Sequence, residues 1–157
     1  MEKIAIIMGS ISDKPVMDKA ADILKELDIS YEMKVLSAHR TPELLHQYIT
    51  GIEKNNFKVI IAGAGGAAHL AGVIASKTLL PVIGVPIETK ALGGLDSLLS
   101  TVQMPGGIPV ATVGIGNAKN AGLMVAHILA IENSKIREKL KEYRQDMAQK
   151  IKDMKIQ

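Results

Sequence analysis

Short runs of apolar residues recur along this chain and alternate with segments of helical periodicity. The apolar runs are short and nearly continuous, as is typical of strands that are covered on both faces. They span residues 4–8, 31–36, 59–62, 81–85 and 109–113. Helical patterns fill residues 15–27, the stretch after Thr41-Pro42, and residues 67–77 and 117–131. This alternation predicts an α/β fold, a three-layer αβα sandwich around a parallel five-stranded sheet with right-handed crossovers.

The final segment, residues 134–155, differs from the rest of the chain. It predicts an amphipathic helix of about six turns. Its apolar positions recur every three or four residues, at Ile136, Leu140, Tyr143, Met147, Ile151 and Met154. A helix of this length either packs on another subunit or lies on its own sheet, and a scaffold protein that assembles through it is one alternative. The length of 157 residues predicts a single α/β domain over 1–157.

Composition excludes several classes of protein. Lys and Arg number 19 against 16 Asp and Glu, a net charge of only +3, and the chain has one Phe, three Tyr and no Trp. Nucleic-acid binders usually show a basic stripe with aromatic stacking residues, so no nucleic-acid partner is expected. The absence of Cys excludes disulfides and thiolate chemistry. No apolar run has membrane-spanning length and the N-terminus lacks a secretory signal pattern, so we expect a cytoplasmic protein without a membrane partner.

Polar residues follow the first two apolar runs, where ligands bind in an open parallel sheet. After the first run, Ser10 and Ser12 offer hydroxyls to an anion such as phosphate, and Asp13 can cap a helix or accept from a ribose. This pattern is equally consistent with a simple capped turn. After the second run come Ser37, Ala38, His39 and Arg40. An imidazole suits proton transfer near neutrality, and a guanidinium can bind a carboxylate or phosphate with two hydrogen bonds.

The third run is followed by small residues over 62–72, which let a ligand or another backbone approach closely. His69 is expected in the first turns of the next helix, as a ligand-facing or a buried histidine. Gly63, Gly65 and Ala68 also match G-x-G-x-x-A, with Glu88 after the next strand, so a nicotinamide or flavin dinucleotide site is an alternative. A dinucleotide-binding unit of this kind would begin at the third strand, and the polar turns after the first two strands would then have no role.

The remaining polar residues carry weaker indications. Residues 93–107 contain Gly-Gly and Pro-Gly-Gly corners, which predict ordered loops around a helical turn with Asp96 and Ser97 as caps. His46 and His127 fall within predicted helices and are expected to be non-catalytic. No group of His and carboxylates has the spacing of metal ligands, so no metal site is expected.

Five short sequence motifs follow one another along almost the whole chain. They lie at residues 8–13, 37–42, 62–70, 94–100 and 103–105 with 109–112. Together they resemble the class I family of N5-carboxyaminoimidazole ribonucleotide mutases of purine biosynthesis. The resemblance implies a flavodoxin-like sheet, a homo-octamer and a ribonucleotide substrate, with no cofactor or metal. It implies an isomerisation that moves a carboxylate from the exocyclic nitrogen to carbon 4 of an imidazole. The class II enzymes, which use free carbon dioxide, have Lys where this chain has Arg40.

The resemblance also implies roles for individual residues. His39 would carry the proton, and Arg40 would assist phosphate binding or face the carboxylate. The ribose phosphate would be held by Ser10, Ser12 and Asp13. The other substrate-binding positions would be Ser37, Gly63, Ala64, Gly65, Gly66, His69 and Leu70. Ala71 stands where the family usually has Pro, which puts the placement of His69 in question. Ile11 stands where Asp is frequent and is expected to be neutral.

Overall fold

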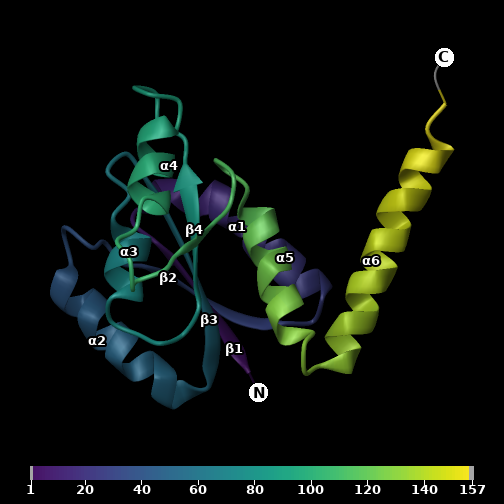
Figure 1. Cartoon of the computed structure of the whole chain (residues 1–157), viewed down its shortest axis with the longest axis horizontal. Coiled ribbons are helices and arrows are strands. Elements are labelled where there is room, and N and C mark those ends of the chain that lie inside the picture. Colours follow the sequence, from purple (N-terminus) through teal and green to yellow (C-terminus); the bar gives the residue numbers. More distant parts are fainter. Residues whose placement is uncertain (1, 156–157) are drawn as a thin grey trace.

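A five-stranded parallel sheet in the order β2-β1-β3-β4-β5 forms the centre of the molecule (Figure 1). The computed structural model describes residues 2–155, apart from the side chain of residue 53. The strands are β1 (Lys3–Met8), β2 (Ser30–Val35), β3 (Phe57–Gly65), β4 (Val82–Ile87) and β5 (Ala111–Thr112). This order is that of the flavodoxin-like fold, and it confirms the predicted architecture. All five carboxyl ends therefore meet at one edge.

Helices cover both faces of the sheet. The helices are α1 (Lys14–Glu26), α2 (Pro42–Ile52), α3 (Leu70–Ala75), α4 (Leu95–Val102), α5 (Ala118–Leu129) and α6 (Ser134–Asp153), with 3-10 turns η1 (Ile11–Asp13) and η2 (Glu53–Asn55). One buried cluster joins the sheet to α1 and α5, and a second joins its other face to α2 and α3. Along β1, Ile4 and Ile6 point into the first cluster and Ala5 and Ile7 into the second. Burial on both faces explains why β1, β3 and β4 are almost continuously apolar, whereas the edge strands β2 and β5 have no fully buried residue.

Four elements differ from those expected. Gly63, Ala64 and Gly65 belong to β3, and the turn comes only at Gly66, whose φ is +67°. A Cβ at Gly63 would lie 2.3 Å from the Sδ atom of Met17 in α1, so a larger residue here would displace the end of that side chain. Helix α3 starts three residues later than expected, at residue 70, and α4 is a complete helix rather than one turn. The last strand has only two residues.

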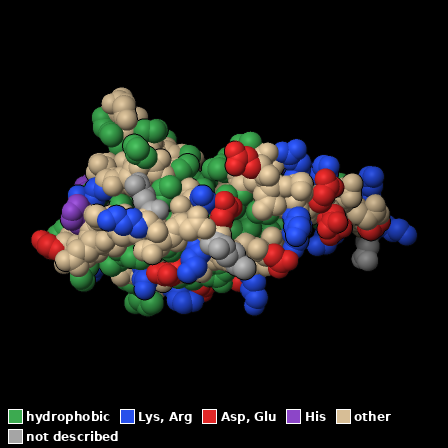
Figure 2. All heavy atoms as spheres, turned by 90° about the horizontal axis from the view of Figure 1, so that it is seen from below, with side chains coloured by type: hydrophobic (Ala, Val, Ile, Leu, Met, Phe, Trp, Pro, Cys, Tyr) green, Lys and Arg blue, Asp and Glu red, His purple; other side chains and the backbone are tan. Residues whose placement is uncertain are grey.

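Helix α6 packs on the body of the protein over its first half only. Asn133 caps it by accepting hydrogen bonds from the backbone N–H groups of residues 135 and 136. Ile136 and Leu140 are buried against the first cluster, whereas Ile151 and Met154 are 66% and 69% exposed. The helix extends away from the sheet in Figure 1, and Figure 2 shows acidic and basic side chains along this narrow end. The predicted helix over 134–155 is confirmed to within two residues.

Gly122 allows α5 to pack closely against α1. A Cβ at this position would lie 2.3 Å from Cγ2 of Ile23 and 3.1 Å from the carbonyl oxygen of Ala20. We expect Gly122→Ala to lower the free energy of unfolding by about 1–3 kcal/mol, because the added methyl group must push the helices apart. Urea denaturation measures this change.

The matched control is Gly51→Ala in α2, where the nearest atom to an added Cβ is Nδ2 of Asn55 at 3.9 Å. Alanine is the better helix former, so we expect this variant to gain about 0.5–1 kcal/mol. Equal shifts in the two variants would contradict the close packing at Gly122.

Candidate functional site

The segments that follow β1, β2, β3 and β4 converge on a cavity of about 480 Å³ at the carboxyl edge of the sheet. Its lining residues are Gly9, Ser10, Ser12, Asp13, Ser37, Ala38, His39, Arg40, Ala64, Gly65, Ala67, His69, Leu70 and Thr89. Gly63 and Gly66 are the predicted site residues that do not line it. Gly9, Ala38 and Ala67, which belong to the predicted turns but were not among the predicted site residues, also line it, and so does Thr89, which the sequence did not single out. The cavity lies where β1 pairs with β2 on one side and β3 on the other, which is the switch point of such sheets.

The first turn is held by a capping box. The Ser10 N–H donates to Oδ2 of Asp13 at 3.0 Å, and the Ser12 N–H donates to Oγ of Ser10 at 3.3 Å. The Ser12 hydroxyl donates to the same Oγ at 2.9 Å. Asp13 therefore acts as a capping residue, but of η1; it makes no side-chain cap bond to α1. Both serine hydroxyls are held at the cavity wall by this arrangement.

Asp13 is almost fully buried, and burial raises the pKa of its carboxyl group, although the Ser10 N–H and the nearby Arg40 lower it. The folded protein thus holds this proton more tightly than the unfolded chain, so Asp13 makes the protein less stable as pH rises above the ordinary value of 3.8.

We expect Asp13→Asn to gain stability relative to the wild type as pH rises through this range, because an amide does not titrate and keeps an oxygen for the Ser10 N–H. Thermal unfolding of both proteins across pH 3–7 measures the difference, and a difference that falls with pH would contradict it.

Arg40 connects the second turn to the first. Its Nη2 donates to the carbonyl oxygen of Gly9 at 3.1 Å, and its backbone N–H donates to Oγ of Ser37 at 3.1 Å. Thr41 closes this turn, because its Oγ1 accepts from the Ser37 N–H at 2.9 Å and donates to the Ser37 carbonyl at 3.1 Å. A guanidinium has five N–H donors, so Arg40 can hold the turn and still bind an anion in the cavity.

Two histidines meet at the cavity. Nε2 of His39, after β2, lies 2.8 Å from Nδ1 of His69, after β3, and the rings are nearly perpendicular at 89°. One of the two nitrogens carries the shared proton and the other accepts it. Ala71, at the position of the usual proline, is buried in α3, and His69 still stands directly before that helix. Sequence order alone did not reveal that these two imidazoles are in contact.

The third turn is bonded to α4. The Gly66 N–H donates to Oγ of Ser97 and the Ala68 N–H donates to Oγ of Ser100, both at 2.9 Å. Ser97 is therefore not a helix cap, and Gly94 holds that position. In a dinucleotide site, a glycine turn and the following helix present free N–H groups to the pyrophosphate. Here two of these N–H groups are already bonded and α3 has only six residues, which argues against the dinucleotide alternative.

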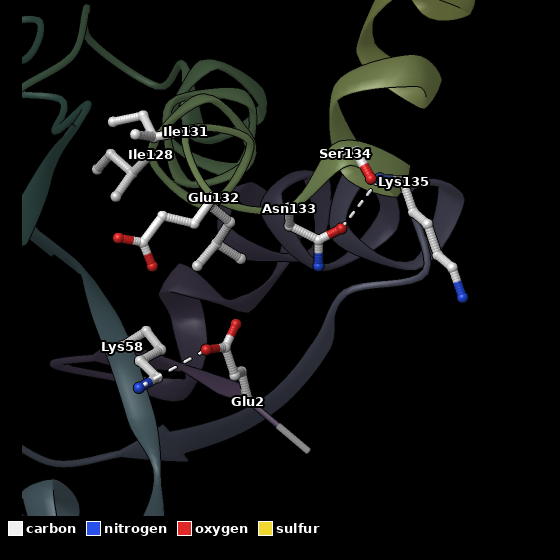
Figure 3. Close-up of a pocket in the computed structure, with 9 residues that line it drawn as sticks. Glu2, Lys58, Ile128, Ile131, Glu132, Asn133, Ser134 and Lys135 are labelled. Carbon is white, nitrogen blue, oxygen red and sulfur yellow. Dashed lines mark hydrogen bonds and ion pairs between the residues drawn. The ribbon is translucent and has the colours of Figure 1, made fainter.

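A larger cavity, of about 790 Å³, lies at the opposite edge of the sheet (Figure 3). Lys58 and Glu2, which line it, form an ion pair with each other at 3.6 Å, and Asn133 is engaged in capping α6. None of the predicted site residues lines this cavity. The smaller cavity, which brings the predicted residues together, is therefore the candidate site.

Two further properties concern the part of the chain that the structure describes. Within residues 2–155, His, Asp and Glu side chains form no group of three or more that could hold a metal ion. No helix in that range combines the length and apolar character needed to cross a membrane.

Comparison with known proteins gives concordant matches. Residues 3–150 match the family model described as AIR carboxylase. The N5-carboxyaminoimidazole ribonucleotide mutase of Pyrococcus abyssi is 64% identical over 147 residues, which are 94% of this chain and 84% of the relative. The mutase of Thermotoga maritima is 57% identical over 96% of this chain and 88% of its own length. A crystal structure of PurE from Treponema denticola matches with a TM-score of 0.89 at 31% identity, covering 96% of this chain and 94% of that one.

Proposed function

This chain belongs to the AIR carboxylase family, and on that premise we propose that it converts N5-carboxyaminoimidazole ribonucleotide to 4-carboxy-5-aminoimidazole ribonucleotide in purine biosynthesis. Relatives at 64% and 57% identity carry the name of this mutase. The observation that carries the proposal is the meeting of a hydroxyl-rich turn, a guanidinium and a pair of imidazoles in one cavity.

The cavity offers one set of groups for each part of such a substrate. The hydroxyls of Ser10 and Ser12 and the guanidinium of Arg40 suit the ribose phosphate, because charge-assisted hydrogen bonds bind phosphate strongly. Asp13 orients this turn, and Ser37 orients Arg40. The histidine pair lines the same cavity as Ala64, Gly65 and Leu70, where the aminoimidazole ring would be bound.

In the proposed reaction, His39 acts as both acid and base. It protonates the exocyclic nitrogen while the nitrogen–carboxylate bond breaks, which gives 5-aminoimidazole ribonucleotide and carbon dioxide. Carbon 4 of the imidazole then attacks the carbon dioxide, and His39 removes the proton from that carbon. The proton that was donated is thus recovered, and one residue serves both steps. His69 shares a proton with His39 and keeps its ring oriented.

Carbon dioxide must be held between these steps. Ala64, Gly65, Ala67 and Leu70 give this part of the cavity a small, apolar wall, which favours exclusion of water. His39 and His69 are nonetheless exposed in the single chain. Retention of the gas therefore requires that substrate or another copy of the chain close the cavity.

Assembly is part of the proposal. The exposed histidines and the uncovered second half of α6 support a homo-oligomer, and the family resemblance favours an octamer of single-domain chains in the cytoplasm. Sedimentation velocity of the purified protein tests this assembly, and a monomer at micromolar concentration would contradict it.

The decisive experiment is incubation of the purified protein with N5-carboxyaminoimidazole ribonucleotide, without ATP, metal or nicotinamide. The product is followed by its ultraviolet absorbance in the presence of labelled bicarbonate. We expect conversion with no label in the product. Labelled product would indicate direct carboxylation with free carbon dioxide instead. No conversion, with NAD raising the melting temperature, would reject the proposal in favour of a dinucleotide site.

A further inference from the structure

We propose that Ser97 and Ser100 of α4 are positioning residues for the reaction: their hydroxyl groups hold the backbone of residues 66–68 and thereby keep His69 in contact with His39. This inference rests on the proposed function. It adds two residues that do not line the cavity.

Ser97 joins the ends of two strands. Its side chain is fully buried, its Oγ accepts from the Gly66 N–H at 2.9 Å, and its hydroxyl donates to the carbonyl oxygen of Ile87 at 2.6 Å. Gly66 directly follows β3, and Ile87 is the last residue of β4. A hydroxyl is the smallest side-chain group that can accept and donate at once, so alanine here would leave both backbone groups without a partner.

Ser100 repeats this arrangement one turn later on α4. Its Oγ accepts from the Ala68 N–H at 2.9 Å, and its hydroxyl donates to the carbonyl oxygen of Asp96 at 2.6 Å. The two serines therefore hold the backbone on either side of Ala67, which is part of the cavity wall.

The position of this backbone determines the position of His69. The His69 N–H donates to the carbonyl oxygen of Ala67 at 2.9 Å, and its Nδ1 lies 2.8 Å from His39. At Gly66 packing does not hold the turn, because no atom lies within 4 Å of the place where a Cβ would stand on this residue, whereas Ala68 is buried. The hydrogen bonds from α4 therefore fix residues 66–68 together with the burial of Ala68.

Thr101 provides a matched control on the same helix. It is also buried, but its hydroxyl donates to the carbonyl oxygen of Ser97 at 2.7 Å, within α4, and lies 3.4 Å from the Ala68 carbonyl. Thr101→Val removes a hydroxyl that is buried, as that of Ser97 is, but the N–H groups of Gly66 and Ala68 keep their bonds to the two serines. It therefore separates loss of stability from loss of positioning.

The test compares Ser97→Ala, Ser100→Ala and Ser100→Thr with Thr101→Val in steady-state kinetics and thermal unfolding. We expect Ser97→Ala and Ser100→Ala to lower kcat by about 10- to 100-fold, because displacements near 1 Å have such effects. KM should change by less than about threefold, since the phosphate contacts lie on other turns. Ser100→Thr keeps the hydroxyl and should restore kcat, whereas Thr101→Val should lower the melting temperature with wild-type kcat.

The inference is overturned if Ser100→Ala, whose side chain is only half-buried, folds and keeps wild-type kcat, or if Thr101→Val loses as much kcat as the serine variants. Ring nitrogen chemical shifts of His39 and His69 in labelled protein give a readout that does not require turnover. They should move in Ser100→Ala and stay unchanged in Thr101→Val. If the wild type does not convert the substrate, the proposed function fails, while the nitrogen shifts still decide whether α4 positions the histidine pair.

Discussion

Replacing His39 with Asn is expected to lower kcat by about 10²- to 10⁴-fold, the range typical for loss of a general acid–base group. The amide of Asn does not titrate near neutrality, so it can neither protonate the exocyclic nitrogen nor remove the proton from carbon 4. Asn can still form a hydrogen bond, and His39 is exposed, so substrate binding and fold should be largely retained. Turnover by ultraviolet absorbance, with a separate binding measurement, tests both parts.

His46→Asn is the matched control for this experiment. His46 lies on α2, is exposed and does not line the cavity, so its replacement should leave kcat and KM unchanged. If His39→Asn retains near-wild-type turnover, the proton-carrier role assigned to His39 is wrong.

Replacing Arg40 with Ala is expected to raise KM by about 10- to 100-fold, with a smaller effect on kcat, because a charge-assisted hydrogen bond to phosphate contributes about 1.5–3 kcal/mol. The variant also loses the contact from Nη2 to Gly9 that joins the first two turns. Arg40→Lys keeps the charge but not the planar set of donors, so its KM should be intermediate. Initial rates over a range of substrate concentrations measure these changes.

Lys14 offers a nearby cation for comparison. It follows the first turn, is exposed, and forms an ion pair with Asp18 at 2.7 Å within α1. Lys14→Ala should have wild-type kinetics. A large loss of kcat at constant KM in Arg40→Ala would show that Arg40 acts on the migrating carboxylate and not on the phosphate.

The sequence predicted the sheet well because its three central strands, β1, β3 and β4, are buried on both faces. The prediction failed where buried residues are not hydrophobic. In α4 the buried side chains are Ser97 and Thr101, whereas Leu95 and Leu99 are 52% and 48% exposed. A pattern in which hydroxyls face inward does not resemble an amphipathic helix, so this segment was predicted as a loop around one turn. The extension of β3 was missed for a related reason, because glycines carry no strand-forming side chain.

The sequence predicted which turns form the site, but not which of their side chains contact one another. The rule that ligands bind at the carboxyl ends of parallel strands was enough to select His39 and Arg40. The 2.8 Å contact between His39 and His69 and the bonds from α4 depend on distances across the sheet, which sequence spacing does not give. Thr89 lines the cavity from the segment after β4, where its hydroxyl donates to Asp96 at 3.2 Å, and no motif marked it.

The place of β1 between β2 and β3 determines when the protein becomes active as it folds. The two histidine turns follow strands that are not neighbours, so they meet only after β1 has paired with both. One of these partners, β3, starts at residue 57, and such distant pairing is slow because the loop must close before contacts stabilise it. A refolding chain should therefore regain helix content and compactness before it regains turnover. Recovered activity then reports the completed order of the central strands together with closure of the cavity, neither of which is measured by spectroscopic signals of collapse.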